Sequence, residues 1–287
     1  MLRAIFEGLR DHLRAGEPVA LATVLEVRGG TGGARGPVAP ATIAGATLLV
    51  RPAGPRVGSL GDAGLDDAVA RDALGQIDAG ATAARRYGPH GEVGRQDVVV
   101  FIEAFTPPPQ MIIFGAVDFA AALARVAKIL GYRVTVCDAR AVFATPARFP
   151  MADEVVVDWP ARHLAAVGPH LGPRDAVCVL THDPKFDVPA IQAALRTGVG
   201  YVGAMGSRRT TADREQRLRS SGVDAAALRR LMAPIGLDIG ARTPEETAVA
   251  ICAEIISVRV GAPTSASLSR TDGPIHHQSL SSESPPG

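Results

Sequence analysis

The sequence is poor in aromatic residues and carries almost no net charge. Aromatic residues make up 4% of its 287 positions although 47% are hydrophobic, so we expect cores built from Ala, Val, Leu and Ile. The 30 basic and 29 acidic residues give a formal net charge of +1. That balance offers no electrostatic footprint for nucleic acid or for an anionic membrane surface. We therefore expect no nucleic-acid partner and no membrane association.

Cysteine is scarce and long apolar runs are missing. Cys137, Cys178 and Cys252 each lie within an apolar run, and no two have the spacing of a metal site. We expect them to be small buried core residues of a protein from a reducing compartment. No apolar run approaches the roughly 18 residues that span a bilayer, and the N-terminus lacks the apolar segment of a signal peptide. These features predict a cytoplasmic protein.

A run of three prolines, residues 107–109, predicts a linker between two domains, because proline fixes an extended backbone and removes sheet donors. We expect residues 1–106 to form a smaller α+β domain and residues 110–262 to form a larger domain. The tail, residues 263–287, is rich in Ser and Pro, and we expect it to be disordered. Its pair His276-His277 either binds a metal adventitiously or is simply solvated.

Hydrophobic periodicity predicts the elements of the first domain. We expect helices over residues 6–13 and 66–77, and strands over residues 19–27, 47–51, 56–60 and 97–105. The glycine-rich stretch 29–36 either cradles an anion on its amides or is a surface loop.

In the second domain, continuous apolar runs alternate with helical segments. We expect strands over residues 110–114, 133–137, 154–157, 176–180 and 199–203, and helices over 118–130, 189–196 and from the capping box Thr243–Glu246 onward. Strands that are apolar on both faces are typical of a parallel sheet covered by helices. The fold class is therefore α/β. A smaller α+β domain comes first in the sequence, and a domain with a Rossmann-like parallel sheet and helical crossovers follows it.

The first strand–helix turn of this Rossmann-like half carries an incomplete phosphate-binding motif. The pattern G-x-G-x-x-G lets the backbone approach a pyrophosphate at a helix N-terminus. The chain has Gly115-Ala116-Val117-Asp118, with only the first glycine in place. Val117 adds a β-branched side chain and Asp118 adds a negative charge beside the expected anion. Alternatively, Asp118 serves as a helix cap.

A second Rossmann marker is present. Asp138 ends the second predicted strand at the spacing of about 20 residues at which a carboxylate meets a ribose hydroxyl. A loop aspartate at a strand end is also common for other reasons, so both interpretations stay open.

Four strings of the second domain together resemble the XdhC/CoxI family, accessory proteins of molybdenum hydroxylase maturation. They are residues 135–150, 181–184, 201–210 and 234–246. The first domain is similar more loosely, through residues 18–29. The resemblance implies a maturation chaperone rather than an enzyme. Such a protein holds the molybdenum cofactor (molybdopterin) during its sulfuration and inserts it into the apoenzyme of a xanthine-dehydrogenase-like molybdenum hydroxylase. It also implies a cysteine desulfurase as a partner and leaves a homodimer open.

The resemblance implies a set of cofactor-binding residues at the carboxyl edge of the sheet. They are Gly115, Ala116, Asp118, Asp138, Arg140, His182, Asp183, Gly203, Ser207, Arg208, Arg209, Gly236 and Asp238.

Three groups in this set have a clear chemistry. Ser207 and the two arginines after it offer a hydroxyl, guanidinium forks and free helix amides to a pterin phosphate. His182 either donates to a ligand and shuttles a proton or is a loop imidazole without a role. Gly236 and Gly240 allow close backbone approach around Asp238, or they form a purely structural turn.

The first domain departs from the family at its expected ligand-contact turn, for which the resemblance implies Gly58, Gly64 and Asp66. Gly64 stands where the family has a cysteine, and Asp66 replaces a glutamate. No cysteine occurs in the first domain, so thiolate chemistry is excluded there. At Val117 and Asp118 the relatives tend to have glycine and histidine.

Two other functions remain open. An NAD(P)-binding oxidoreductase would use the Rossmann-like half as a nucleotide-binding domain. A divergent paralogue would keep the fold and act as a scaffold or regulatory subunit without binding a cofactor. No Ser-His-Asp arrangement or metal-ligand cluster stands out, so we expect neither catalytic residues nor a metal site.

Overall fold

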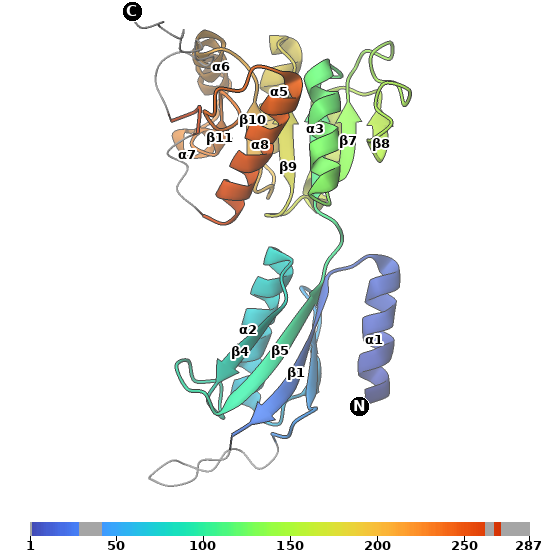
Figure 1. The fold of residues 1–287 in the computed structure, drawn as a ribbon, viewed down its shortest axis with the longest axis vertical. Helices are drawn as coiled ribbons and strands as arrows, with labels where there is room; N and C mark the ends of the chain where they lie inside the picture. Colours follow the sequence, from blue (N-terminus) through green and yellow to red (C-terminus); the bar gives the residue numbers. More distant parts are fainter. Residues whose placement is uncertain (1, 29–41, 262–266, 271–287) are drawn as a thin grey trace, which may run out of the picture. The chain divides into compact units, whose positions relative to one another are not determined.

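The fold was analysed in a computed structural model that describes residues 2–28, 42–261 and 267–270 (Figure 1). The chain divides into two compact units, Met1–Pro107 and Pro108–Gly287, and the boundary falls within the run of three prolines. The glycine-rich stretch 29–36 and the pair His276-His277 lie outside the described residues.

The N-terminal unit is an antiparallel sheet with the strand order β3-β2-β1-β5-β4. Its elements are α1 (Leu2–Ala15), β1 (Val19–Val27), β2 (Thr47–Val50), β3 (Val57–Ser59), α2 (Ala63–Ala79), β4 (Ala83–Tyr87) and β5 (Val98–Phe105). Alternate residues of β2 face different helices, because side chains alternate along a strand. Leu48 and Val50 pack in the core with α2, whereas Leu49 packs with Ile5 of α1.

Helix α2 begins earlier than the apolar periodicity predicts, because the cap lies upstream. Asp62 is its N-cap, and one oxygen of its carboxylate accepts a hydrogen bond from the Leu65 amide at 3.0 Å. The helix ends at Gly80, whose φ of 61° is the left-handed conformation common after helices. Strand β4 was not expected from the sequence, since it carries Arg85 and Arg86 at the exposed edge of the sheet.

The C-terminal unit is a parallel six-stranded sheet with the strand order β11-β10-β9-β6-β7-β8. The strands are β6 (Gln110–Phe114), β7 (Arg133–Cys137), β8 (Glu154–Val156), β9 (Ala176–Val179), β10 (Tyr201–Ala204) and β11 (Leu231–Met232). The helices are α3 (Asp118–Ile129), α4 (Pro160–Val167), η1 (Gly168–His170), α5 (Pro184–Leu195), α6 (Arg208–Ser220), α7 (Ala225–Leu228) and α8 (Pro244–Arg259).

Helices cover both faces of this parallel sheet. Helices α3 and α8 pack together over one face, and α4, α5 and α6 contribute to the core on the other. The predicted α/β fold class, in which a smaller N-terminal unit is followed in the sequence by a unit with a Rossmann-like sheet, is confirmed. The predicted start of the helix over residues 189–196 was wrong, because α5 begins at Pro184. Pro184 occupies its first position and Asp183 is the cap, accepting a hydrogen bond from the Lys185 amide at 3.0 Å.

Residues 267–270, which we call the C-terminal strap, pack against the C-terminal unit. Ser267 is fully buried and its hydroxyl donates to the buried carboxylate of Glu254. The Leu268 amide donates to the Gly236 carbonyl at 2.9 Å. The strap lies within the tail that the sequence predicts to be disordered, and these polar contacts together with the buried Leu268 hold it against the unit. Among the helices that the structure describes, none combines the length and hydropathy needed to cross a bilayer.

Candidate functional site

Two cavities lie at the carboxyl edge of the parallel sheet, beside the point where the strand order reverses between β6 and β9. Ligands of open α/β sheets bind at such a switch point, because the loops after the two strands diverge there. The larger cavity has a volume of about 590 Å³ and the smaller one of about 450 Å³. His182, in the loop after β9, lines both.

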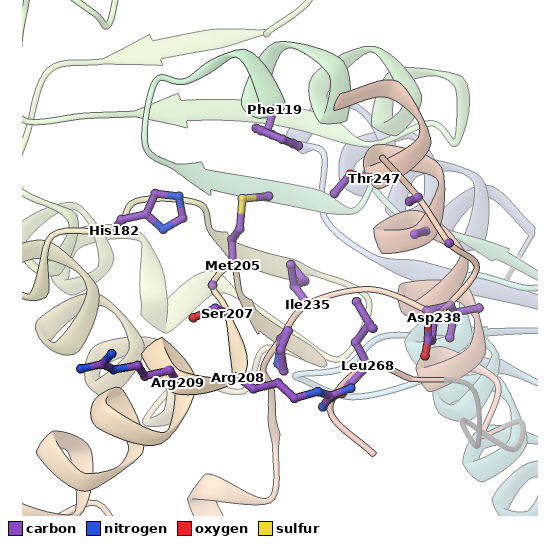
Figure 2. A pocket seen from close by; sticks show the side chains of 16 residues that line it. Phe119, His182, Met205, Ser207, Arg208, Arg209, Ile235, Asp238, Thr247 and Leu268 are labelled. Carbon is purple, nitrogen blue, oxygen red and sulfur yellow. Dashed lines mark hydrogen bonds between the residues drawn. The ribbon is translucent and has the colours of Figure 1, made fainter. Parts of the chain in front are cut away.

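The larger cavity combines apolar walls with a few polar groups (Figure 2). Its volume lies within the range of about 300–1,000 Å³ that is usual for small-molecule sites. The predicted residues that it brings together are His182, Ser207, Arg208, Arg209 and Asp238. The residues that sequence reasoning missed are mainly apolar or small: Phe119, Met205, Gly206, Pro234, Ile235, Leu237, Ala241, Thr247, Ala250 and Leu268.

The polar end of this cavity is the N-terminus of α6. Ser207 is the N-cap, and its hydroxyl accepts a hydrogen bond from the Thr210 amide at 3.1 Å. The free amides and the positive end of the helix dipole at such a terminus favour an anion. Arg208 extends toward Leu268 and donates from Nη1 to its carbonyl at 3.0 Å, whereas Arg209 points the other way (Figure 2).

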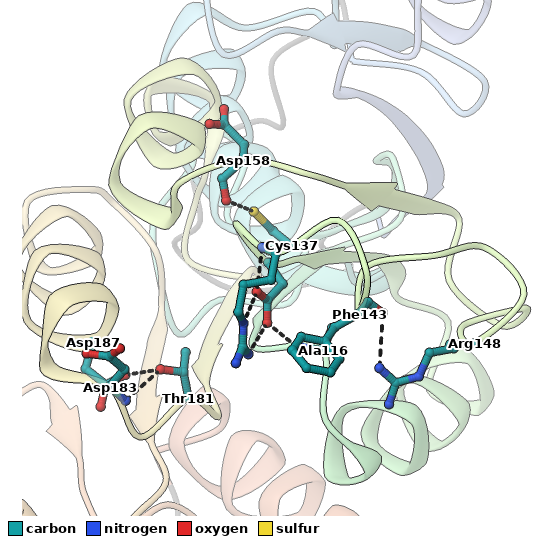
Figure 3. Close-up of polar contacts among 10 residues, drawn as sticks. Ala116, Cys137, Phe143, Arg148, Asp158, Thr181, Asp183 and Asp187 are labelled. Carbon is teal, nitrogen blue, oxygen red and sulfur yellow. Dashed lines mark hydrogen bonds and ion pairs between the residues drawn. The ribbon is translucent and has the colours of Figure 1, made fainter.

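A buried ion pair supports the loops on which these groups sit. Arg214 of α6 and Asp187 of α5 are each 3% exposed, and Nη2 of Arg214 lies 2.9 Å from the carboxylate. The same Nη2 donates to the Met205 carbonyl at 2.8 Å, and the Thr181 hydroxyl donates to Asp187 at 2.5 Å (Figure 3). Burial raises the pKa of Asp187, and the hydrogen bonds from Thr181 and Arg214 oppose that shift. The pair thus ties the loop after β9 to the loop after β10.

The incomplete phosphate-binding motif forms a turn that is shaped by packing. Gly115 has a φ of 105°, and a Cβ there would lie 2.9 Å from the Thr181 amide nitrogen, so the neighbouring strand end requires a glycine. The alternative that Asp118 caps its helix was wrong. Val117 is the N-cap without a side-chain hydrogen bond, and the carboxylate of Asp118 is 90% exposed, 3.7 Å from Arg148.

Asp138 is committed to contacts within the protein. Each of its carboxylate oxygens accepts two hydrogen bonds. The donors are the amide of Ala116 at 2.9 Å, labelled in Figure 3, and the amide and guanidinium of Arg140 at 2.8–2.9 Å. Burial of the side chain opposes ionisation, but these bonds lower the pKa of Asp138 below its ordinary value. Arg140 also stacks on Phe143, with its Cζ 4.5 Å from the ring centroid. A ribose would have to displace this arginine.

Three of the predicted residues line the smaller cavity: Arg140, His182 and Asp183. Val117 and Phe186 add apolar surface. Because Asp183 caps α5, its side chain has a structural role at the rim.

The predicted glycines of the C-terminal unit shape the walls. Gly203 lies inside β10, where a Cβ would approach Cδ1 of Ile235 to 2.5 Å, so this glycine makes room for a residue of the cavity wall. Gly236 has a φ of 101°, and its amide donates to the Glu254 carboxylate at 2.9 Å. This contact favours the alternative of a structural turn at Gly236, whereas Asp238 lines the larger cavity.

The three candidates of the N-terminal unit have structural roles. Gly58, with a φ of 97°, leaves no room for a Cβ against the Thr47 carbonyl of the neighbouring strand. Asp66 accepts a hydrogen bond from the Leu60 amide at 2.7 Å and so fixes the turn before α2. At Gly64 a Cβ would lie 2.6 Å from the carbonyl oxygen of His90.

The cysteines are all buried and free. Burial raises the pKa of Cys137 to about 12 and that of Cys252 to about 12, and it raises the pKa of Cys178 well above its ordinary value. None of these thiols lines either cavity at the sheet edge. Within residues 2–28, 42–261 and 267–270, the His, Cys, Asp and Glu side chains form no group of three or more that could hold a metal ion.

Comparison with known families matches both units. The XdhC Rossmann domain matches residues 111–255, about half of the chain, and the XdhC and CoxI family matches residues 12–88. The chain belongs to the XdhC and CoxI family. The resemblance inferred from the strings between residues 135 and 246 is confirmed.

Two curated relatives and one solved structure illustrate the similarity. A probable xanthine dehydrogenase subunit from Bacillus subtilis is 34% identical over 178 residues, which cover 62% of this chain and 50% of that protein. The molybdenum cofactor insertion chaperone PaoD of Escherichia coli is 29% identical over 160 residues, covering 56% and 43%. The chain thus spans about half the length of these relatives or less. A xanthine dehydrogenase structure from Bacillus halodurans aligns over 93% of this chain and 98% of its own, with 20% identity and a TM-score of 0.48.

Proposed function

We propose that this protein binds the molybdenum cofactor and assists its insertion into a xanthine-dehydrogenase-like molybdenum hydroxylase. Support comes from family membership and from two relatives, one named as a cofactor insertion chaperone and the other as part of a probable xanthine dehydrogenase. The observation that carries the proposal is the larger cavity, in which apolar walls meet the Ser207-capped N-terminus of α6.

The residues of this cavity suit a planar ring with an anionic arm. Phe119, Met205 and Ile235 offer surfaces on which a pterin ring packs. The cap of α6 and the adjacent arginines suit the terminal phosphate, because helix amides and guanidinium groups are strong donors to phosphate oxygens. His182, between the two cavities, would donate to the polar edge of the ligand.

In this proposal the protein holds and delivers the cofactor but does not supply sulfur. Its three thiols are buried, and burial keeps them protonated. Sulfur for the cofactor would come from a partner such as a cysteine desulfurase. The geometry gives the NAD(P)-dependent alternative less support, because both oxygens of Asp138 are engaged by Arg140 and Ala116.

Titration with released molybdenum cofactor, followed by tryptophan fluorescence or calorimetry, tests this function. Wild type should bind saturably, and a Ser207→Ala, Arg209→Gln variant should bind about tenfold more weakly, because one or two charge-assisted hydrogen bonds are lost. Arg196→Gln serves as the control, since this exposed arginine of the same unit lines neither cavity. Absence of saturable binding to wild type would refute the proposal and favour a scaffold role beside the hydroxylase.

A further inference from the structure

A third recess lies away from the sheet edge, between α6, α7, β11 and the C-terminal strap. Its volume is about 350 Å³, and it shares no lining residue with the two cavities described above. Helices α6 and α7 and strand β11 gather at one side of the C-terminal unit (Figure 1). The proposed function uses none of the residues that line this recess.

The recess is rich in positive charge. Three arginines line it, Arg219 and Arg229 from the helical side and Arg270 from the strap, against the single carboxylate of Glu215. Glu215 pairs with Arg219 at 2.6 Å. Among the residues that the structure describes, the side chains of Arg229 and Arg270 have no hydrogen-bond or ion-pair partner. Two exposed guanidinium groups at the recess therefore have no carboxylate paired with them within the described residues.

Arg270 is held at the recess by the anchoring of the strap. The Ser267 hydroxyl donates to the buried Glu254 carboxylate, and the Ser269 hydroxyl contacts the sulfur of Met232 at 3.6 Å. The Arg270 amide donates to the Ser267 carbonyl at 2.9 Å, which closes a turn. The position of the Arg270 backbone therefore depends on contacts with the folded unit.

We propose that this recess is a second binding site, for a small multivalent anion that bears a phosphate or diphosphate group. Guanidinium forks match phosphate oxygens in pairs, and binding would neutralise the free charges of Arg229 and Arg270. The volume fits a diphosphate with a small organic substituent, and Leu228 and Met232 provide apolar surface for that substituent. Occupation of the site also clamps the strap, whose Leu268 forms part of the wall of the larger cavity.

Calorimetric titration of the full chain with inorganic pyrophosphate at low salt tests this site, and adenosine diphosphate tests whether an organic substituent adds affinity. Wild type should bind pyrophosphate saturably. An Arg229→Gln, Arg270→Gln variant should bind at least about tenfold more weakly, because two charge-assisted contacts are lost. Circular dichroism checks that this variant is folded.

Two matched variants locate the binding. Arg133→Gln, Arg196→Gln removes the same charge from exposed positions of the same unit outside the recess, and it should bind within twofold of wild type. Ser207→Ala, Arg209→Gln removes the proposed phosphate contacts of the larger cavity, so the pyrophosphate binding that remains in this variant belongs to the recess and should be lost when Arg229→Gln, Arg270→Gln is added. The proposal is overturned by absence of saturable binding, by unchanged binding in the Arg229→Gln, Arg270→Gln variant, or by an equal loss in either matched variant. None of these outcomes depends on whether the molybdenum cofactor binds.

Discussion

Replacing Gly64 with alanine should destabilise the N-terminal unit, although Gly64 lies in helix α2, where alanine is ordinarily more favourable than glycine. A Cβ at residue 64 would sit 2.6 Å from the His90 carbonyl oxygen, where ordinary contact begins near 3.4 Å. Gly91 makes the reciprocal contact, because its own Cβ would lie 2.6 Å from the Gly64 carbonyl oxygen. Overpacking of this kind costs about 1–3 kcal/mol, and the helix propensity of alanine returns up to about 1 kcal/mol. We expect a net loss of up to about 2 kcal/mol.

Urea denaturation separates this effect from general effects of glycine substitution. Gly75→Ala is the matched control in the same helix, since a Cβ there has no neighbour within 4 Å. The control should stabilise the unit by about 0.5–1 kcal/mol. Far-UV circular dichroism follows both units, whereas the single tryptophan, Trp159, reports only on the C-terminal unit. If Gly64→Ala raised the midpoint as much as Gly75→Ala does, the steric argument would be refuted.

Three further predictions concern polar contacts. Asp138→Asn should destabilise the C-terminal unit by about 2–4 kcal/mol at neutral pH, because an amide nitrogen cannot accept the bonds of a carboxylate. Folding lowers the pKa of Asp138, so its carboxylate stabilises the fold above the unfolded pKa of about 3.9. This stabilisation is lost as the pH falls through the folded pKa. The urea midpoints of wild type and Asp138→Asn should therefore converge in acid. Asp62, 2.8 Å from His90, raises the pKa of that imidazole, so an NMR titration should place it above about 6.5 and Asp62→Asn should lower it. Ser267→Ala should speed hydrogen exchange at the Leu268 amide about tenfold, and an unchanged rate would contradict the anchoring of the strap.

The sequence predicted those elements whose signals are local. The strands of the parallel sheet are apolar on both faces, which gives continuous hydrophobic runs. The capping box of α8 depends on residues a single turn apart, and both of its hydrogen bonds, between Thr243 and Glu246, are present.

Features that depend on distant partners escaped prediction. Arg214 looks like any other arginine of a charged helix, and its partner Asp187 lies on another helix beyond β10. The strap is ordered because Ser267 meets Glu254, a carboxylate in the middle of α8 that has no special sequence context. The apolar walls of the larger cavity come from α3, α8 and three loops, so no single motif contains them.

Two of the positions at which the chain departs from the residues that the family resemblance implies, Gly64 and Asp118, differ in how they can be tested. Gly64 and the turn at His90–Gly91 fit each other closely, so introducing at residue 64 the cysteine that the resemblance implies would perturb packing before any thiol chemistry could be measured. Asp118 is 90% exposed and only distantly paired with Arg148, so Asp118→His changes the charge beside the α3 N-terminus with little effect on the fold. The histidine variant is therefore the informative one. If Asp118 opposes an anionic ligand, its replacement should tighten binding of the molybdenum cofactor, and equal affinities would show that the proposed ligand lies beyond the reach of this charge.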